Sequence, residues 1–331
     1  MSRRGFPYGH PTGWFQIAWS GELAIGDVRP AKYFGQDLVI FRGESGRVTV
    51  LSAHCQHLGA HLGYGGRVAE DDIVCPFHEW RWSPEGENVE IPYADQGPSR
   101  RRIRCWPVLE QSGLVFVWHS PSGAEPTWQP PSIPEFESED YYHLYPDGTA
   151  CESVRLYPQF VLENMVDYAH LGSVHNWNLD RPKVDKIEAS EHSFVANTSG
   201  LMATPKGPAP MQALNVAWGV ALVISRLRGL RDVAFMSSVT PIDDDCSEVR
   251  ISTVVRRAAG DTGNQLDSYA KAMIVAQNEA ILGSNPGDRD IWEHQIYLTT
   301  PAFVREEVGG FRALREWAHR FYEPGGDATG A

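Results

Sequence analysis

The sequence is poor in cysteine and in positive charge, and it has no long apolar run. Its five cysteines are spread over 331 residues, which excludes a small disulfide-stapled fold and indicates reduced thiols or metal ligands. Lysine and arginine total 29 against 42 acidic residues, and the resulting net charge of -13 argues against a nucleic acid or an anionic membrane as a partner. No apolar stretch approaches transmembrane length. We therefore expect a cytoplasmic protein without a membrane span.

We also expect no twin-arginine export signal. The segment Ser2-Arg3-Arg4-Gly5-Phe6 superficially resembles a twin-arginine signal, but prolines and glycine follow where an apolar region should stand. The chain is rich in aromatic residues (11 %), as in a well-packed globular protein. Prolines concentrated between residues 121 and 134 form the clearest linker. We therefore expect two domains, 1–125 and 126–331.

The first domain has the pattern of a small antiparallel β domain, with glycines between short segments rich in aromatic and β-branched residues. The second domain alternates such segments with helical patterns. Strands are predicted at 13–19, 37–42, 47–51, 101–108, 114–118, 217–224, 233–239 and 248–255, and a helix is predicted at 265–282.

Two short loops in the first domain each carry one cysteine and one histidine. The order is Cys55-x-His57 and then Cys75-x₂-His78. Two thiolates and two imidazoles suit a [2Fe–2S] cluster in which histidines replace cysteines on one iron, the Rieske arrangement. A zinc site is the rival metal prediction, although zinc fingers usually pair cysteine with cysteine and histidine with histidine. The alternative without a metal is that these are ordinary core residues.

A second motif lies in the second domain. Asn164, Asp167 and His170 are spaced three residues apart, which predicts one polar stripe on a helix. His175 falls beyond that face, but Gly172 predicts a helix end that lets the chain bring the second imidazole back. Two imidazoles beside a carboxylate suit a mononuclear Fe(II) centre. The alternative is a helix with solvated polar residues.

Such an iron site needs a carboxylate as its third ligand. The segment Pro286-Gly287-Asp288-Arg289-Asp290 offers two candidates, Asp288 and Asp290. An aspartate after Pro-Gly is also a good helix N-cap, so the residues alone leave the choice open.

The two motifs, in this order, resemble those of the oxygenase component of Rieske non-haem iron oxygenases, over essentially the whole chain. Three segments are similar to the 3-ketosteroid 9α-hydroxylase oxygenase and its sterol-desaturase relatives: 78–82, 91–93 and 113–119. The resemblance implies an α+β fold, with a Rieske domain followed by a helix-grip catalytic domain. It selects Asp288 as the third iron ligand, because the family's aspartate precedes a helix carrying Ile-Trp.

The resemblance also implies roles and partners. In a ring-shaped homotrimer, Asp167 would connect His170 to His78 of the partner subunit, and Asn164 would orient an iron-bound water or simply pack in its helix. The chain has no G-x-G-x-x-G motif and no C-x₄-C-x₂-C ferredoxin run, so electrons must come from a separate NAD(P)H reductase, with or without a ferredoxin. Dioxygen is the co-substrate.

The expected function is monooxygenation of an apolar, steroid-like substrate. The alternatives are dihydroxylation of a polycyclic aromatic, desaturation, demethylation, pure electron transfer, or a sensor that has lost the iron site. Strand residues expected on the cavity floor, about half of them lining it, are Val220, Leu222, Ile224, Phe235, Met236 and Val239. The steroid prediction itself rests on the resemblance alone.

Overall fold

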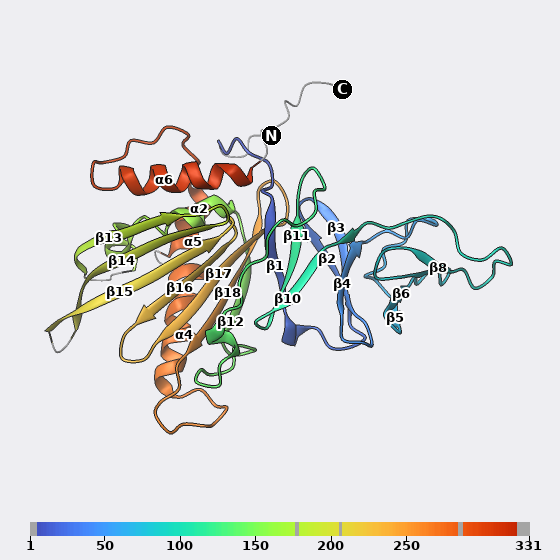
Figure 1. Ribbon diagram of the computed structural model, residues 1–331, viewed down its shortest axis with the longest axis horizontal. Coiled ribbons are helices and arrows are strands. Elements are labelled where there is room, and N and C mark those ends of the chain that lie inside the picture. The colour runs from blue at the N-terminus through green and yellow to red at the C-terminus, as the bar shows by residue number, and fades with distance from the viewer. Residues whose placement is uncertain (1–4, 176–178, 205–206, 284–286, 323–331) are drawn as a thin grey trace.

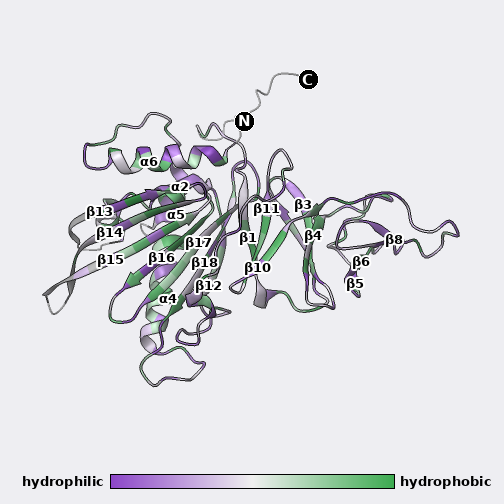
Figure 2. Ribbon diagram, in the orientation of Figure 1, coloured by the Kyte–Doolittle hydropathy of each residue, from purple (hydrophilic) through white to green (hydrophobic). Residues whose placement is uncertain are grey.

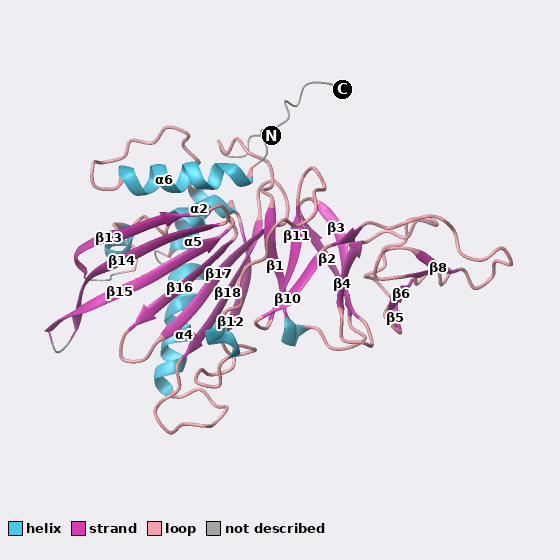
Figure 3. Cartoon of the chain, in the orientation of Figure 1, coloured by secondary structure: helices cyan, strands magenta, loops and turns pink. Residues whose placement is uncertain are grey.

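The computed structural model describes residues 5–175, 179–204, 207–283 and 287–322. The chain forms an N-terminal half built of small sheets and a C-terminal half built on one large sheet with helices (Figure 1). Figure 3 shows that most of the helix lies in the C-terminal half. The predicted α+β class is confirmed.

The N-terminal half consists of three antiparallel sheets. Two of them form its body, and the third carries the loop after β6. The strands are β1 (Gly13–Trp19), β10 (Val108–Gln111) and β11 (Leu114–His119); β2 (Val28–Tyr33), β3 (Gln36–Arg42), β4 (Val48–Ser52) and β9 (Cys105–Trp106); and β5 (Arg67–Ala69), β6 (Asp72–Val74), β7 (Arg81–Trp82) and β8 (Asn88–Glu90).

The C-terminal half is a seven-stranded antiparallel sheet in the order β12-β18-β17-β16-β15-β14-β13. Helices α4 and α5 lie against one face, α6 contacts β13, and α2 contacts β17 and α6 (Figure 1). The strands are β12 (Thr149–Val154), β13 (Leu179–Ala189), β14 (Ser193–Thr204), β15 (Gly207–Trp218), β16 (Leu222–Arg228), β17 (Val233–Pro241) and β18 (Ser247–Val255). The helices are α1 (Pro134–Glu137), α2 (Pro158–Glu163), α3 (His170–Ser173), α4 (Ser268–Leu282), α5 (Asp288–His294) and α6 (Val308–Ala318), with short 3₁₀ turns at Ser20–Glu22 and His319–Phe321.

Strand β1 joins the two halves. All seven of its residues are buried, and its apolar side chains share one hydrophobic core cluster with residues of β16 and β17. The neighbouring strands β10 and β11 are coloured mainly as hydrophobic in Figure 2. Gln16 is the polar exception in β1, and its side chain accepts a hydrogen bond from Ser238 Oγ at 2.7 Å, while its carbonyl accepts one from Thr240 at 2.6 Å. Because a buried polar group needs such partners, these bonds fix β1 against β17. The N-terminal half thus covers one face of the large sheet and leaves the other face to the helices.

Most predicted strands are present, but the segment 217–224 is not one strand. The chain turns between β15 and β16, where Gly219 has a φ of 59°. This left-handed conformation favours glycine and allows a tight reversal. The segment 101–108 forms only the two-residue strand β9 before β10 begins. Strands β13 and β14 and helix α6 were not predicted. The boundary at residue 125 stays a prediction.

Helix α4 begins at Ser268 rather than near Gln265, because Asp267 is its N-cap. The Asp267 carboxylate accepts the backbone N–H of Ala270 and also binds Arg231. Such a cap satisfies a backbone donor that the first helical turn leaves free. Within the described ranges, none of the helices is long and apolar enough to cross a membrane.

Candidate metal centres and active-site cavity

The two Cys–His loops lie side by side at the end of the N-terminal half. The rings of His57 and His78 are 4.6 Å apart, and both cysteines, Cys55 and Cys75, are buried. Each loop turns back on its cysteine: the carbonyl of Cys55 accepts the N–H of Gly59, and that of Cys75 accepts the N–H of Glu79. These turns bring two thiols and two imidazoles into one place.

The donor atoms in these loops fit a [2Fe–2S] cluster. Nδ1 of His57 and Nδ1 of His78 are both buried, and neither has a hydrogen-bond partner among the described residues. Buried polar atoms rarely lack a hydrogen-bond partner. Two such nitrogens in the same loops as two buried cysteines are what we expect of ligands to a metal cluster. A hydrogen bond with Cys55 and the backbone N–H groups of the loop outweigh burial and lower the pKa of Cys75 to about 6. The same hydrogen bond, together with burial, raises the pKa of Cys55.

The ring of His57 stacks on Trp80 at 4.6 Å with parallel planes. Trp80 donates its indole N–H to the hydroxyl of Tyr93 at 2.8 Å. The neighbouring histidines outside the pattern have other partners: His54 contacts the carbonyl of Gly59, and His61 accepts the N–H of Gly63.

In the C-terminal half, His170, His175 and Asp288 come together. One ligand atom from each lies within 4.8 Å of the others. Nε2 of His175 is 3.3 Å from Oδ1 of Asp288, and Nε2 of His170 is 4.0 Å from the same oxygen. Asp290 is not part of this group. Two imidazoles and one carboxylate that bind one face of a metal ion are the donor set of a mononuclear iron site, in which the remaining coordination positions stay open.

Asp167 and Asn164 support this group, but not as a helical stripe. Helix α2 ends at Glu163, Asn164 is its C-cap, and α3 begins only at His170. The predicted continuous helix is wrong, because the Asp167 carboxylate accepts the N–H groups of Ala169 and His170 at 3.1 and 3.2 Å. An aspartate that binds nearby backbone donors favours a turn over a helix interior.

These contacts orient the His170 ring. Its Nδ1 lies 2.5 Å from the carbonyl of Asp167, so this nitrogen is the donor and Nε2 is left for a metal. Burial lowers the pKa of His170, but the Asp167 side chain and the charges of Asp288 and Asp167 outweigh it and raise the pKa above its ordinary value. Burial raises the pKa of Asp167, but its bonds to His170 and Ala169 outweigh burial and lower it.

Asn164 holds the third member of the group. Its amide donates to Oδ2 of Asp288 at 3.0 Å, which neither of its predicted roles includes. Asp288 is the first residue of α5, and the N-cap position is taken by Gly287. The N-cap alternative for Asp288 is therefore wrong.

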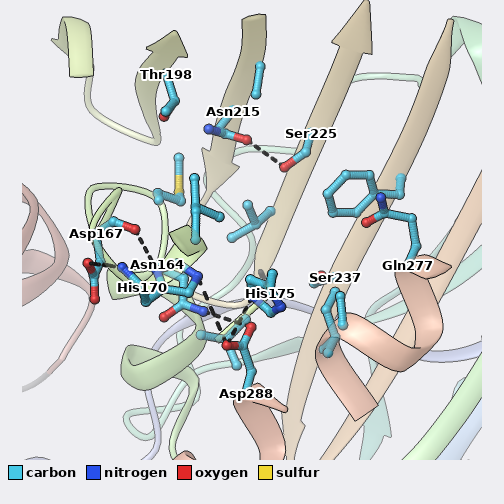
Figure 4. Close-up of a pocket in the computed structure, with 18 of the residues that line it drawn as sticks. Asn164, Asp167, His170, His175, Thr198, Asn215, Ser225, Ser237, Gln277 and Asp288 are labelled. Atoms are coloured by element: carbon cyan, nitrogen blue, oxygen red, sulfur yellow. Dashed lines mark hydrogen bonds and ion pairs between the residues drawn. The ribbon is translucent and has the colours of Figure 1, made fainter. Parts of the chain in front are cut away.

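The group lies at the base of a cavity of about 830 Å³, counted with its open mouth, between the large sheet and the helices (Figure 4). Most of the surface of the wall is apolar, although half of the lining residues are polar or charged. The lining residues are Val161, Asn164, Met165, Asp167, His170, Leu171, His175, Thr198, Ala213, Asn215, Val223, Ser225, Leu227, Phe235, Ser237, Gln277, Ala280, Ile281, Asp288 and Trp292.

Of the six strand residues predicted for the cavity floor, only Phe235 lines it. Val220 and Val239 lie in the core. Leu222, Ile224 and Met236 face the N-terminal half and line a separate apolar space there. Because side chains alternate along β16, the residues that reach the cavity are instead Val223, Ser225 and Leu227.

Sequence reasoning also missed the polar residues of the wall: Thr198, Asn215, Ser225, Ser237 and Gln277. The available signal was polar residues at alternate positions of apolar strands. Which face of the sheet these residues occupy can be told only once the strand register is known.

Comparisons with known proteins agree with this architecture. Residues 13–107 match the model of the Rieske [2Fe-2S] domain, and residues 117–322 match that of the 3-ketosteroid 9alpha-hydroxylase C-terminal domain. A probable 3-ketosteroid-9-alpha-monooxygenase oxygenase component from Rhodococcus rhodochrous is 29 % identical, covering 96 % of this chain and 81 % of its own. Cholesterol 7-desaturase from Bombyx mori is 38 % identical, covering 96 % of this chain and 70 % of its own.

Solved structures share the fold. Dicamba monooxygenase bound to 3,6-dichlorosalicylic acid superposes with a TM-score of 0.71 at 18 % identity, covering 94 % of this chain and 97 % of the other. At that identity the likeness concerns the fold alone.

The matched domains define the class: this is a Rieske-type oxygenase, an iron-dependent oxidoreductase. Within that class, the chain belongs to the family of the 3-ketosteroid 9α-hydroxylase C-terminal domain. Members include monooxygenase oxygenase components and sterol desaturases. The match of residues 117–322 to a hydroxylase domain argues against a pure electron carrier. The match of residues 13–107 to the Rieske domain argues against a zinc site. The relatives named as oxygenase components imply a separate reductase.

Proposed function

We propose that the chain hydroxylates an apolar, steroid-like substrate with dioxygen, using electrons that a separate reductase takes from NAD(P)H. The observation that carries the proposal is the convergence of His170, His175 and Asp288 at the base of an apolar cavity. The steroid class is supported by the relatives named as steroid and cholesterol enzymes. A cytoplasmic location, where NAD(P)H is at hand, is part of the proposal.

His170, His175 and Asp288 would hold the mononuclear iron. When bound, Fe(II) in this donor set supplies open coordination positions for dioxygen beside the substrate. The protein's own contribution is orientation: the Asp167 carbonyl fixes the His170 ring, and Asn164 fixes the Asp288 carboxylate. The apolar wall excludes water and leaves room for a hydrocarbon skeleton.

Cys55, His57, Cys75 and His78 would hold the [2Fe–2S] cluster, which supplies electrons one at a time. We further propose a homotrimer in which His78 of the partner subunit bonds to Asp167. Two features support an intersubunit contact: Leu58 and Phe77, at the tips of the two loops, are 66 % and 61 % exposed, and the Asp167 side chain is 33 % exposed. Light scattering of the iron-loaded protein tests the trimer, and a monodisperse monomer would contradict it.

Desaturation is the second candidate, favoured by the 38 % identity to cholesterol 7-desaturases. Turnover under ¹⁸O₂ separates the outcomes. Hydroxylation installs one labelled atom, dihydroxylation two and desaturation none. The test screens steroids, bile-acid intermediates and polycyclic aromatics with a surrogate reductase and mass spectrometry. A singly labelled steroid supports the proposal, and turnover of polycyclic aromatics alone would overturn it.

A further inference from the structure

The loop that joins β8 to β9, residues 91–104, carries a run of arginines that the proposed function does not use. The segment Arg100-Arg101-Arg102-Ile103-Arg104 has four arginines in five positions, whereas the whole chain has 29 lysines and arginines among 331 residues and a net charge of -13. All four arginines are exposed. Figure 1 shows this arginine loop at the end of the N-terminal half that lies farthest from the large sheet. A local surplus of positive charge on an acidic protein creates a field that attracts an acidic partner.

Two of these arginines have partners within the protein, and two do not. Arg102 forms an ion pair with Glu87, and the guanidinium of Arg104 lies over a tryptophan ring at 4.0 Å from its centre. The side chains of Arg100 and Arg101 form no ion pair, hydrogen bond or ring contact with any residue that the structure describes. Exposed charges contribute little to the stability of a fold, so these two guanidinium groups are available to a partner outside the chain.

The arginine loop is connected to the cluster site at both of its ends. Near its start, the Tyr93 hydroxyl accepts the indole N–H of Trp80 at 2.8 Å, and Trp80 stacks on His57, a proposed cluster ligand. At its end, the carbonyl of Arg104 accepts the N–H of Ser52 at 2.9 Å, and Ser52 ends β4, the strand that leads into the first Cys–His loop. A protein that docks on the arginine loop is therefore held next to the cluster.

The charge of the rest of the chain decides between the kinds of acidic partner. A nucleic acid or an anionic membrane would meet a chain whose net charge is -13, so repulsion outside the loop opposes both. A protein with an acidic patch meets only the loop, and opposite charges on the two surfaces raise the association rate and fix the orientation. Next to a cluster that accepts electrons, such a protein is an electron carrier. The exposed tips Leu58 and Phe77, which the proposed trimer uses, belong to the cluster loops, so the carrier and the partner subunit contact different residues.

We propose that an acidic electron-carrier protein docks on the arginine loop through Arg100 and Arg101 and reduces the cluster beside it. The inference rests on the proposed function and specifies the surface charge of its reductase or ferredoxin partner. In the step itself, one electron passes from the reduced carrier to the cluster, no bond forms or breaks, and the carrier leaves oxidised by one electron. A plant-type ferredoxin at about -400 mV can make this transfer, because a Rieske cluster lies at roughly -150 to +300 mV.

Stopped-flow reduction of the cluster tests the docking surface without turnover. The protein, loaded with cluster and Fe(II), is mixed anaerobically with a reduced plant-type ferredoxin of acidic surface, at about 10 mM and about 200 mM salt. We expect reduction to be about 10-fold or more slower at the higher salt, because the attraction between the two surfaces is screened. Arg100→Glu with Arg101→Glu should slow reduction at low salt about 10-fold or more and remove most of the salt dependence. Calorimetry with the same ferredoxin should show weaker binding to this variant.

Three controls separate the loop from total charge and from damage to the cluster. Arg228→Glu with Arg312→Glu adds the same negative charge at two exposed positions of the C-terminal half, and it should be reduced by ferredoxin at close to the wild-type rate. Arg100→Lys with Arg101→Lys keeps the charge and should keep most of the rate. Photoreduced deazaflavin, a small reductant, should reduce the cluster of every variant as fast as that of the wild type, which shows that the cluster is intact.

A wild-type cluster that ferredoxin reduces no faster at about 10 mM than at about 200 mM salt would overturn the docking surface. Equal slowing in the control with Arg228→Glu and Arg312→Glu would also overturn it, because total charge would then explain the effect. Binding to vesicles of phosphatidylserine and phosphatidylcholine that is lost in Arg100→Glu with Arg101→Glu would assign the loop to a membrane instead. These results leave the proposed function intact. A protein that assembles no cluster, or whose cluster deazaflavin does not reduce, would overturn the proposed function.

Discussion

The amide of Asn164 donates a hydrogen bond of 3.0 Å to the carboxylate of Asp288 across 124 residues of sequence. The bond links the C-cap residue of α2 to the first residue of α5, Asp288, which is one of the three proposed iron ligands. Replacing a group that orients a metal ligand typically weakens metal affinity or activity.

Asn164→Ala should therefore weaken Fe(II) binding about 10–100-fold while the [2Fe–2S] cluster stays intact. Anaerobic Fe(II) titration of the cluster-loaded protein measures this. Asn197→Ala, on the far face of the sheet, is the control and should bind Fe(II) like the wild type. Unchanged affinity in Asn164→Ala would show that Asp288 does not need this bond.

Replacing the carboxylates of α5 distinguishes the two candidates for third ligand. Asp288→Ala should reduce the iron content from about three to about two per chain, since the cluster remains. Asp290→Ala should keep about three, because Asp290 lies outside the ligand group. Metal analysis by mass spectrometry gives the count, and the reverse result would assign the role to Asp290.

Asp167→Asn should leave both metal centres loaded and lower turnover about 100-fold or more, since the proposed link to the partner subunit's cluster depends on its charge. The backbone carbonyl that orients His170 is unchanged by this substitution. The measurements are iron content, single-turnover rate and steady-state rate with a surrogate reductase. Turnover near the wild-type value would contradict the proposal that Asp167 connects His170 to His78 of the partner subunit.

An ion pair between the buried Glu163 and the partly buried Arg315 joins α2 to α6. Arg315 donates to both carboxylate oxygens at 2.8 and 2.9 Å, and Gln159 donates a further bond. Arg315→Met should lower the free energy of unfolding by about 3 kcal/mol, because it leaves a buried carboxylate without its cation. Glu163→Met together with Arg315→Met should recover most of this loss in urea unfolding. A double variant less stable than Arg315→Met would contradict the argument.

His119 makes stability depend on pH. It is 4 % exposed, stacks on Phe34 at 4.0 Å, and burial lowers its pKa from 6.5 to about 4. Between these values the unfolded chain binds a proton that the folded chain does not. The free energy of unfolding therefore falls by about 3 kcal/mol as pH decreases from 6.5 to 4. Above pH 6.5 this contribution does not change with pH.

His119→Gln cannot titrate and should show a smaller loss of stability over this pH window. Thermal unfolding from pH 4 to 7 measures the difference. His143→Gln, at an exposed position, should follow the wild-type curve. Parallel curves for His119→Gln and the wild type would show that His119 does not carry the effect.

The sequence allowed the ligand motifs to be predicted because the ligands of each motif are close in sequence. One turn of the chain is enough to bring Cys55 close to His57. The same holds for His170 and His175. Asp288 was selected by resemblance, since no local rule separates it from Asp290. Its contact with Asn164 joins segments that are 124 residues apart in sequence, and only the tertiary structure brings them together.

The cavity wall was largely missed for a different reason. One residue of register decides whether a strand side chain faces the cavity or the N-terminal half, so Val223 and Leu222 have opposite environments. The turn at Gly219 sets that register and was not recognised within the apolar run. The prediction that Asn164, Asp167 and His170 share one helical face was wrong. Residue spacing does not reveal that the Asp167 side chain binds the backbone N–H of His170 and so starts a new turn.

The most direct measurement is the iron inventory of the anaerobically reconstituted protein, taken together with its spectra. The account predicts about three irons per chain, the absorption and electron paramagnetic resonance of a Rieske cluster, and a separate ferrous signal that disappears in His175→Ala while the cluster signal stays. A preparation with about two irons and no separate ferrous signal, or one that holds zinc in place of the cluster, would contradict it.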